Sequence, residues 1–262
     1  IEFIDVVFDK KAANLEKPTI CLDDCTAEEL TENILQAEQR VLQRIKFVSS
    51  SVNSIFYDRF NLVGTSSLFK KVTNNICRVA STDSRVLIHG ETGTGKESAA
   101  QAIHYLSSRT DKPFIPVNCG AFSDELLLSE LFGHKKGAFT GALENRPGLI
   151  QSADGGTLFL DEVDTLSTRA QVALLRFLQE NEIRPIGSRK AISVDVRVVA
   201  ASNKHLSKLV EAGLFRDDLL YRLDVLKINL PPLRRREDDV FLVAQQMLSK
   251  ISAELERPPK VL

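Results

Sequence analysis

The sequence has no long apolar segment and no excess of charge of either sign. No apolar run approaches the roughly 18 residues of a membrane-spanning helix, and the N-terminal residues show no signal-peptide pattern. The 34 lysines and arginines are balanced by 35 aspartates and glutamates, for a net charge of -1. We therefore expect a cytoplasmic protein with no membrane partner. A broadly basic nucleic-acid surface is excluded, so any contact with DNA is local or lies outside this chain.

Cysteine is scarce, and its spacing excludes two common uses. The four cysteines, Cys21, Cys25, Cys77 and Cys119, form no C-x-x-C pair and have no histidines at the spacing of zinc ligands. We expect reduced thiols. A redox role for Cys21 and Cys25 is the alternative.

What is present is typical of a globular protein with a large core. Of the 262 residues, 43% are hydrophobic and 26% are charged. The chain begins at Ile1 rather than at a methionine and ends at Leu262, shortly after a predicted helix. We expect both ends to continue in a longer protein.

Residues 1 to 60 are interpreted as the end of an upstream regulatory region followed by a helical linker. From about residue 26 to residue 55, apolar side chains recur every three or four positions. Such a stripe is typical of a dimerisation helix, and equally of an amphipathic helix that packs on its own domain. The sequence leaves both interpretations open.

From residue 61 onward, short apolar runs alternate with helical stretches. The runs lie at residues 86 to 88, 114 to 117, 157 to 160, 194 to 200 and 226 to 230. Apolar strands separated by helices indicate an α/β fold, with a parallel sheet covered by helices on both faces. We expect this domain to span residues 61 to 232. A helix near residues 238 to 255 would then begin a small helical lid, residues 233 to 262.

The first of these strands runs into a glycine-rich turn that starts at Gly90. The spacing of Gly90, four residues, Gly95 and Lys96 is that of a phosphate-binding Walker A loop, whose backbone N–H groups surround a triphosphate. Lys96 would reach the outer phosphates. The next residue is usually a serine or threonine that holds Mg²⁺, but here it is Glu97. The predicted phosphate-loop residues are Gly90, Glu91, Thr92, Gly93, Thr94, Gly95, Lys96 and Glu97.

Two later strands end in polar side chains that suit the same chemistry. The strand at residues 157 to 160 is followed by Asp161 and Glu162. Asp161 would hold Mg²⁺, and Glu162 would orient or deprotonate the attacking water. The strand at residues 194 to 200 leads to Ser202 and Asn203, which a parallel sheet would place beside Asp161. These two are candidate sensors of the γ-phosphate.

Two arginines, Arg216 and Arg222, lie six residues apart in a predicted helix. An arginine supplied to a transferring phosphate can raise the rate about a thousandfold. The spacing alone favours the plainer interpretation of two solvated side chains.

A glycine-bounded segment with one aromatic residue decides between these interpretations. It consists of Gly137, Ala138, Phe139, Thr140, Gly141 and Ala142. Alone it predicts a surface loop. Together with residues 118 to 136, the phosphate loop and the run from Gly155 to Glu162, it resembles the AAA+ domain of sigma-54-dependent transcription activators, the NtrC-like bacterial enhancer-binding proteins. The resemblance covers residues 61 to about 258.

The resemblance implies an AAA+ ATPase that uses ATP and Mg²⁺ to activate transcription. In that family the GAFTGA loop contacts sigma-54 and remodels the closed complex of sigma-54 RNA polymerase, so Phe139 and Thr140 are the expected contact residues. Family members are dimers in the off state and hexameric rings when active. A C-terminal domain, expected beyond Leu262, would bind DNA.

Roles for individual residues follow from the same resemblance. Asn118 matches the switch asparagine that holds the catalytic glutamate, here Glu162. Ser202 and Asn203 match the first sensor.

The resemblance also reverses the reading of the two arginines. Arg216 and Arg222 match the pair that reaches the nucleotide of the neighbouring subunit. Leu62, Val63 and Gly64 lie where the family begins its adenine pocket. Glu97 is regular in the family, so Mg²⁺ would depend on Asp161, Glu162 and phosphate oxygens.

One departure from the family pattern keeps an alternative open. Where the family usually has Gly-Arg-Phe-Glu, this chain has Gly148, Leu149, Ile150 and Gln151, so two charges are missing. The alternative is a nucleotide-binding transcription regulator of the same family that does not act through sigma-54. The retained GAFTGA segment favours the first interpretation. A generic AAA+ remodeller has no sequence feature of its own here.

Overall fold

The computed structural model describes residues 5–7, 19–21, 56, 59–139, 141–237 and 239–255. The chain divides into two compact units, residues 1–55 and 56–262. In the first unit, β1 (Asp5–Val7) pairs in parallel with β2 (Thr19–Cys21). The apolar stripe predicted at residues 26 to 55 lies outside the described residues, as does Cys25.

The second unit is built on a five-stranded sheet in which every neighbouring pair is parallel. Its strands are β3 (Val86–His89), β4 (Phe114–Asn118), β7 (Thr157–Asp161), β10 (Arg197–Ser202) and β11 (Leu226–Asn229). Their order across the sheet is β11, β3, β10, β7, β4. The predicted α/β fold with a parallel sheet is therefore confirmed.

One strand begins later than predicted. We expected a strand from residue 194, but β10 begins at Arg197. Ile192 and Ser193 form β9 (Ile192–Ser193), which pairs with β8 (Glu182–Ile183) instead, and the N–H of Val194 donates to Asn181 O. These hydrogen bonds hold the apolar residues before Arg197 outside the main sheet.

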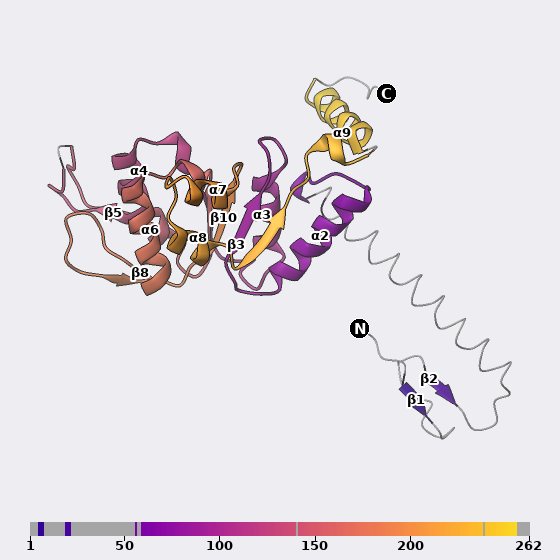
Figure 1. The fold of residues 1–262 in the computed structure, drawn as a ribbon, viewed down its shortest axis with the longest axis horizontal. Coiled ribbons are helices and arrows are strands. Elements are labelled where there is room, and N and C mark those ends of the chain that lie inside the picture. The colour runs from indigo at the N-terminus through magenta and orange to yellow at the C-terminus, as the bar shows by residue number, and fades with distance from the viewer. Residues whose placement is uncertain are drawn as a thin grey trace. The chain divides into compact units, whose positions relative to one another are not determined.

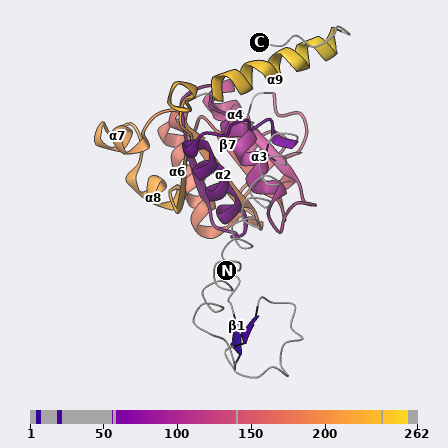
Figure 2. The same cartoon turned by 90° about the vertical axis from the view of Figure 1, so that its right-hand side faces the viewer.

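Helices cover both faces of this sheet (Figure 1). On one face, α2 (Ser67–Ala80) and α3 (Lys96–Tyr105) lie side by side (Figure 2). The other face carries α4 (Asp124–Phe132), α6 (Thr168–Glu180) and α8 (Asp217–Leu223). Leu87 joins the core on the α6 and α8 side, whereas Val86 and Ile88 point the other way, because side chains alternate along a strand. Burial on both faces explains the apolar strands.

Shorter elements connect this framework. They are η2 (Cys119–Ala121), β5 (Gly133–His134), β6 (Arg146–Pro147), α5 (Leu149–Ser152), η3 (Val163–Thr165), α7 (Leu206–Glu211) and η4 (Leu233–Arg235). The last described helix is α9 (Asp239–Glu254), which lies beside one end of α2 in Figure 1. Among the described residues, no helix combines the length and apolar character needed to cross a membrane.

A fully buried histidine lies between α3 and the sheet. His104 is shielded from solvent, and its Nδ1 lies 2.9 Å from Thr157 Oγ1. Its Nε2 has no hydrogen-bond partner among the described residues. Burial, followed by the positive charge of Arg197, lowers the pKa of His104 below its ordinary value, although a backbone hydrogen bond opposes this. The imidazole is therefore neutral in the folded protein.

We expect this histidine to make the fold less stable in mild acid. Its pKa is lower folded than unfolded, so the unfolded chain takes up the proton first as the pH falls below about 6.5. The free energy of unfolding is therefore unaffected by this histidine above that pH, and below it falls by up to about 1.4 kcal/mol per pH unit. Urea unfolding at pH 7.5 and 5.5 checks this. The His104→Gln variant should show the shallower dependence, and equal slopes would contradict the prediction.

Candidate active site

The phosphate loop connects β3 to α3. Lys96 is almost fully buried, and its Nζ donates to Gly90 O at 3.1 Å and to Glu91 O at 3.2 Å. Gly95 adopts a left-handed conformation with φ of 90°, which a residue with a side chain rarely adopts, and it caps α3. The ammonium group is thereby held over the turn, at the N-terminus of a helix.

The loop leaves several backbone donors available. The N–H groups of Thr92, Gly93, Gly95 and Lys96 have no hydrogen-bond acceptor among the described residues. Thr94 Oγ1 instead donates inside the loop, to Glu91 O at 2.8 Å. Glu97 is exposed and lies 3.5 Å from Gln101 Nε2. The free N–H groups beside Lys96 suit a ligand with several negative oxygens.

The order of the strands brings the other predicted residues to the same edge of the sheet. Lys96 follows β3, Ser202 ends β10, Asp161 ends β7 and Asn118 ends β4. These four strands are consecutive neighbours, and Asn118 is directly opposite Asp161 in the register. The carboxyl ends of parallel strands are the usual place for a ligand.

Glu162 is held in a specific position by the backbone. It has φ of 55° and ψ of 42°, a left-handed conformation that is uncommon for glutamate, and its N–H donates to Asp161 Oδ1 at 2.9 Å. A Cβ atom placed on Gly120 would lie 2.4 Å from Glu162 Oε2. The carboxylate therefore packs directly on the backbone of η2, and a side chain at position 120 would displace it.

Asn118 lies next to Glu162, and its side chain caps the turn that follows β4. Its Oδ1 accepts a hydrogen bond from Gly120 N at 2.8 Å, which caps η2. Both side chains flank Gly120, and among the described residues no hydrogen bond joins them. The switch role that the resemblance implies for Asn118 stays a prediction.

The first of the candidate sensor residues is tied into a network that the sequence did not reveal. Ser202 Oγ donates to Asp164 Oδ1 at 2.8 Å and is close to the backbone of Lys204. Lys204 Nζ lies 3.5 Å from the other Asp164 oxygen. Asn203 is half-buried at the end of the same strand.

The acidic side chains also affect a neighbouring thiol. Burial, reinforced by the charges of Asp161, Glu162 and Asp164, raises the pKa of Cys119 to about 12. Cys119 is therefore a protonated and unreactive thiol, since the thiolate is the nucleophilic form.

Residues 62 to 64 lie between the phosphate loop and the start of α9. Leu62 and Val63 are buried, and a Cβ atom on Gly95 would lie 3.3 Å from Leu62 Cδ2. Gly64 is in close contact with Asp239, since an added Cβ would be 2.5 Å from its Oδ2. The predicted adenine-pocket residues thus lie against the loop on one side and the start of α9 on the other.

The two arginines lie at the start and in the last turn of α8, and both face solvent. Arg216 precedes the helix and forms two hydrogen bonds with Asp218, of 3.0 Å and 2.8 Å. These bonds raise the pKa of Arg216 above its ordinary value. Arg222 is exposed in the last turn. Neither arginine makes a hydrogen bond to the phosphate loop in the described part of the chain, so this protomer alone does not bring them to the site.

The GAFTGA segment forms a loop between β5 and β6. Gly137 N donates to Ala142 O at 2.9 Å, and Gly137 and Gly141 have φ of 80° and 103°. The ring of Phe139 is 45% exposed and meets the edge of His134, with centroids 5.0 Å apart. Thr140 lies outside the described residues. The aromatic side chain is thus available at the surface.

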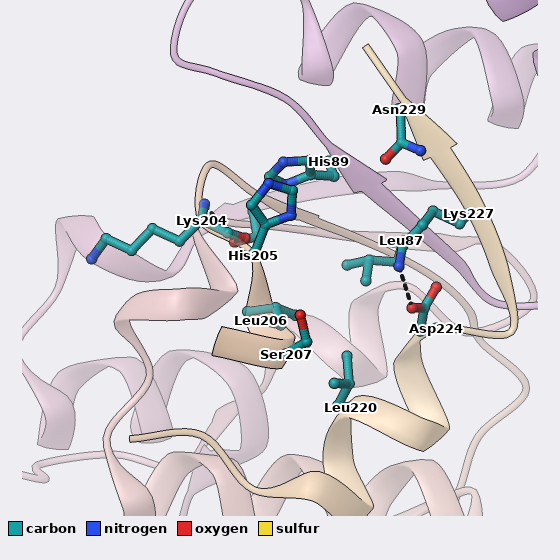
Figure 3. A pocket seen from close by; sticks show the side chains of 11 residues that line it. Leu87, His89, Lys204, His205, Leu206, Ser207, Leu220, Asp224, Lys227 and Asn229 are labelled. Carbon is teal, nitrogen blue, oxygen red and sulfur yellow. Dashed lines mark hydrogen bonds and ion pairs between the residues drawn. The ribbon is translucent and has the colours of Figure 1, made fainter. Parts of the chain in front are cut away.

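A cavity of about 200 Å³ lies beside the strand ends, between β3, β10, α7 and α8 (Figure 3). The imidazoles of His89 and His205 meet there with centroids 4.1 Å apart and ring planes tilted by 34°, while Lys204 extends away. Lys227 is paired with Asp224 at 2.7 Å. Burial, and then the neighbouring cations, lower the pKa of His89, so that its imidazole is neutral at pH 7. No motif in the sequence singles out this pair, because the two histidines are far apart in the chain and meet only in the fold.

The fold and this arrangement of residues define a P-loop NTPase of the AAA+ class. The model of the sigma-54 interaction domain family matches residues 62–229. The chain belongs to this family, which comprises the sigma-54-dependent, NtrC-like activators.

Individual relatives agree with this assignment. The transcriptional regulatory protein ZraR of Salmonella typhimurium is 44% identical over 88% of this chain and 52% of its own length. The response regulator protein PilR of Pseudomonas aeruginosa is 47% identical over 75% of this chain and 44% of its own length. A crystal structure of NtrX from Brucella abortus with ADP has a TM-score of 0.72 at 32% identity, covering 92% of this chain and 53% of that one. The chain spans about half the length of these relatives.

Proposed function

We propose that this chain is the ATP-hydrolysing motor of a transcription activator that acts on sigma-54 RNA polymerase. The observation that carries the proposal is the convergence of Lys96, Asp161, Glu162 and Ser202 at the ends of three adjacent strands. Membership of the sigma-54 interaction domain family supports the choice of partner. The ADP in the NtrX structure, which has the same fold at 32% identity, supports the choice of nucleotide.

The residues present fit a magnesium ion that accompanies ATP. Mg²⁺ in such sites keeps several waters and takes one or two carboxylates plus phosphate oxygens. Asp161 is half-buried at the end of β7, and only its Oδ1 is used in a hydrogen bond within the described residues. Asp161 would hold the ion, which would neutralise charge on the phosphates. No group of three or more metal-ligating side chains is needed, and the described residues contain none.

The chain's own residues account for binding and for proton transfer. Lys96 would exchange the carbonyl oxygens of Gly90 and Glu91 for phosphate oxygens, which are stronger acceptors. Glu162 would accept the proton of the attacking water, which adds to the γ-phosphorus as the bond to the β-phosphate oxygen breaks. Asn118 and the sensor residues Ser202 and Asn203 would register the presence of the γ-phosphate.

The remaining parts of the proposal concern assembly. Arg216 and Arg222 would act on the nucleotide of a neighbouring protomer in a hexameric ring. In such a ring each protomer contacts the next head to tail, so one protomer can supply arginines to the site of its neighbour. Residues 233 to 262 would begin the helical lid. Residues 1 to 60 would connect an upstream regulatory region to the ATPase domain and would form the dimer contacts of the off state. A further domain of the whole protein would bind DNA.

Phe139 provides the test of the sigma-54 contact. We expect Phe139→Ala to leave ATP hydrolysis within about twofold and to reduce sigma-54-dependent transcription at least tenfold, because a central aromatic anchor carries much of an interface's binding energy. Hydrolysis and open-complex formation are measured on the same preparations.

Leu143→Ala is the matched control for this test. Leu143 is 79% exposed and follows the same loop, outside the GAFTGA segment. It should retain both activities. Equal transcription by Phe139→Ala and the parent protein would contradict the proposal.

A further inference from the structure

The chain from the end of β11 to the first residue of α9 makes close contacts with the proposed nucleotide site. Three of its residues, Arg234, Arg236 and Asp239, contact the phosphate loop or the stretch before α2, and we call them the linker residues. The sequence distances spanned are 143, 142 and 173 residues or more. None of the three belongs to a motif that the sequence reveals.

Arg234 forms an ion pair with Glu91, an exposed residue of the phosphate loop. Its Nη1 donates to Glu91 Oε2 at 2.7 Å and its Nη2 to Glu91 Oε1 at 2.5 Å, a two-point contact that fixes the direction of both planar groups. These hydrogen bonds lower the pKa of Glu91 below its ordinary value. Both carboxylate oxygens of Glu91 are therefore bonded to Arg234, which holds this part of the phosphate loop in place.

Arg236 fixes the direction of one peptide group of the loop. It is buried, its Nη2 donates to Thr94 O at 3.1 Å and its Nε to Pro231 O at 2.8 Å. Its guanidinium carbon lies 5.0 Å from the centre of the Phe69 ring. A trans peptide group points its C=O and N–H in opposite directions, so holding Thr94 O outward directs the N–H of Gly95 inward.

Asp239 organises the opposite wall. It is 1% exposed at the first residue of α9, and its Oδ1 accepts from Thr65 N at 2.7 Å and from Ser66 N at 2.9 Å. Its Oδ2 accepts from Ser66 Oγ at 2.8 Å. This carboxylate, with three donors, fixes the backbone directly after Leu62, Val63 and Gly64.

We propose that the linker residues are positioning residues, which hold the phosphate loop and residues 62 to 64 in the geometry that binds ATP. This inference rests on the proposed ATPase function. It makes nucleotide affinity depend on how the chain enters α9, because the same six-residue stretch contacts both walls of the site. A nucleotide that orders these walls would in turn order the start of α9.

Arg234 is the residue to test, since it is 65% exposed and its replacement should not prevent folding. We expect Arg234→Ala to raise the Kd for ADP about three- to fivefold, the range for an exposed pair with good geometry. Arg234→Lys should fall between, because lysine keeps the charge and loses the two-point contact. Calorimetric titration of ADP into the protein measures this without requiring hydrolysis.

Arg235→Ala is the matched control. Arg235 belongs to the same turn, carries the same charge and is exposed, but it makes no hydrogen bond to Glu91. Its charge also lowers the pKa of Glu91, but without a hydrogen bond to the carboxylate. The Arg235→Ala variant should therefore bind ADP within about twofold of the parent, because solvent and salt screen a charge that makes no direct contact. If Arg234→Ala and Arg235→Ala raised the Kd equally, the effect would come from the loss of one positive charge and not from the contact with Glu91. That result would overturn the inference.

A double-mutant cycle separates positioning from any general effect on the fold. If Arg234 acts through Glu91, then Arg234→Ala should add less than about twofold in a Glu91→Gln background. Fully additive effects would overturn the inference. Failure of the parent protein to bind ADP would instead contradict the proposed function, so the two outcomes are distinguishable.

Discussion

Replacing Glu162 with glutamine should slow ATP hydrolysis about a hundredfold to ten-thousandfold, while ATP affinity stays within about twofold. The range is that of a lost general base. Glutamine has the shape of glutamate, so it keeps the contact with Gly120 and the left-handed backbone at position 162. Only the ability to accept a proton is removed. Steady-state phosphate release and nucleotide titration on the same preparation measure the two quantities.

Glu180→Gln is the control for this experiment. Glu180 is an exposed carboxylate at the end of α6, 3.7 Å from Arg176, and in the part of the chain that the structure describes it makes no hydrogen bond to a site residue. It should hydrolyse ATP normally. If Glu162→Gln were equally active, the base would have to be sought elsewhere at the strand ends.

Replacing Arg216 with alanine should reduce ATP hydrolysis by about a thousandfold, because an arginine finger stabilises charge on the transferring phosphate. In one protomer this side chain is paired with Asp218 and makes no contact with the phosphate loop among the described residues. The effect should therefore require a neighbouring subunit. Parent activity per protomer should rise with protein concentration as rings form.

Mixing two inactive variants tests that requirement directly. Lys96→Ala lacks a working phosphate loop, and Arg216→Ala lacks the finger. If the finger acts across an interface, a mixed ring contains some interfaces with both functional groups, about one quarter at equal amounts and random order. Recovery of activity on mixing is expected. No recovery, with mixed rings demonstrated, would mean that Arg216 acts within its own protomer or not at all.

The parts of the fold that repeat a simple rule could be predicted from the residues. Apolar runs such as the one from Val86 to Ile88 are buried on both faces, which only a covered parallel sheet allows. The phosphate loop was predicted from the spacing of Gly90, Gly95 and Lys96. The structure shows one reason for its glycines, since Gly93 and Gly95 have positive φ. The predicted start of β10 was wrong, since the hydrogen bond from Val194 N to Asn181 O and the pairing of β9 with β8 override local apolarity.

The sequence by itself determined the sheet, the phosphate loop after its first strand, and the carboxylates at the end of β7, because each depends on residues that are neighbours in the chain. Only the tertiary structure decided the strand order that brings Asn118, Asp161 and Ser202 together. It also decided the contacts of Arg234 with Glu91 and of Asp239 with Ser66. These join residues more than a hundred positions apart, and a hydrogen bond forms only where folding brings donor and acceptor within about 3 Å.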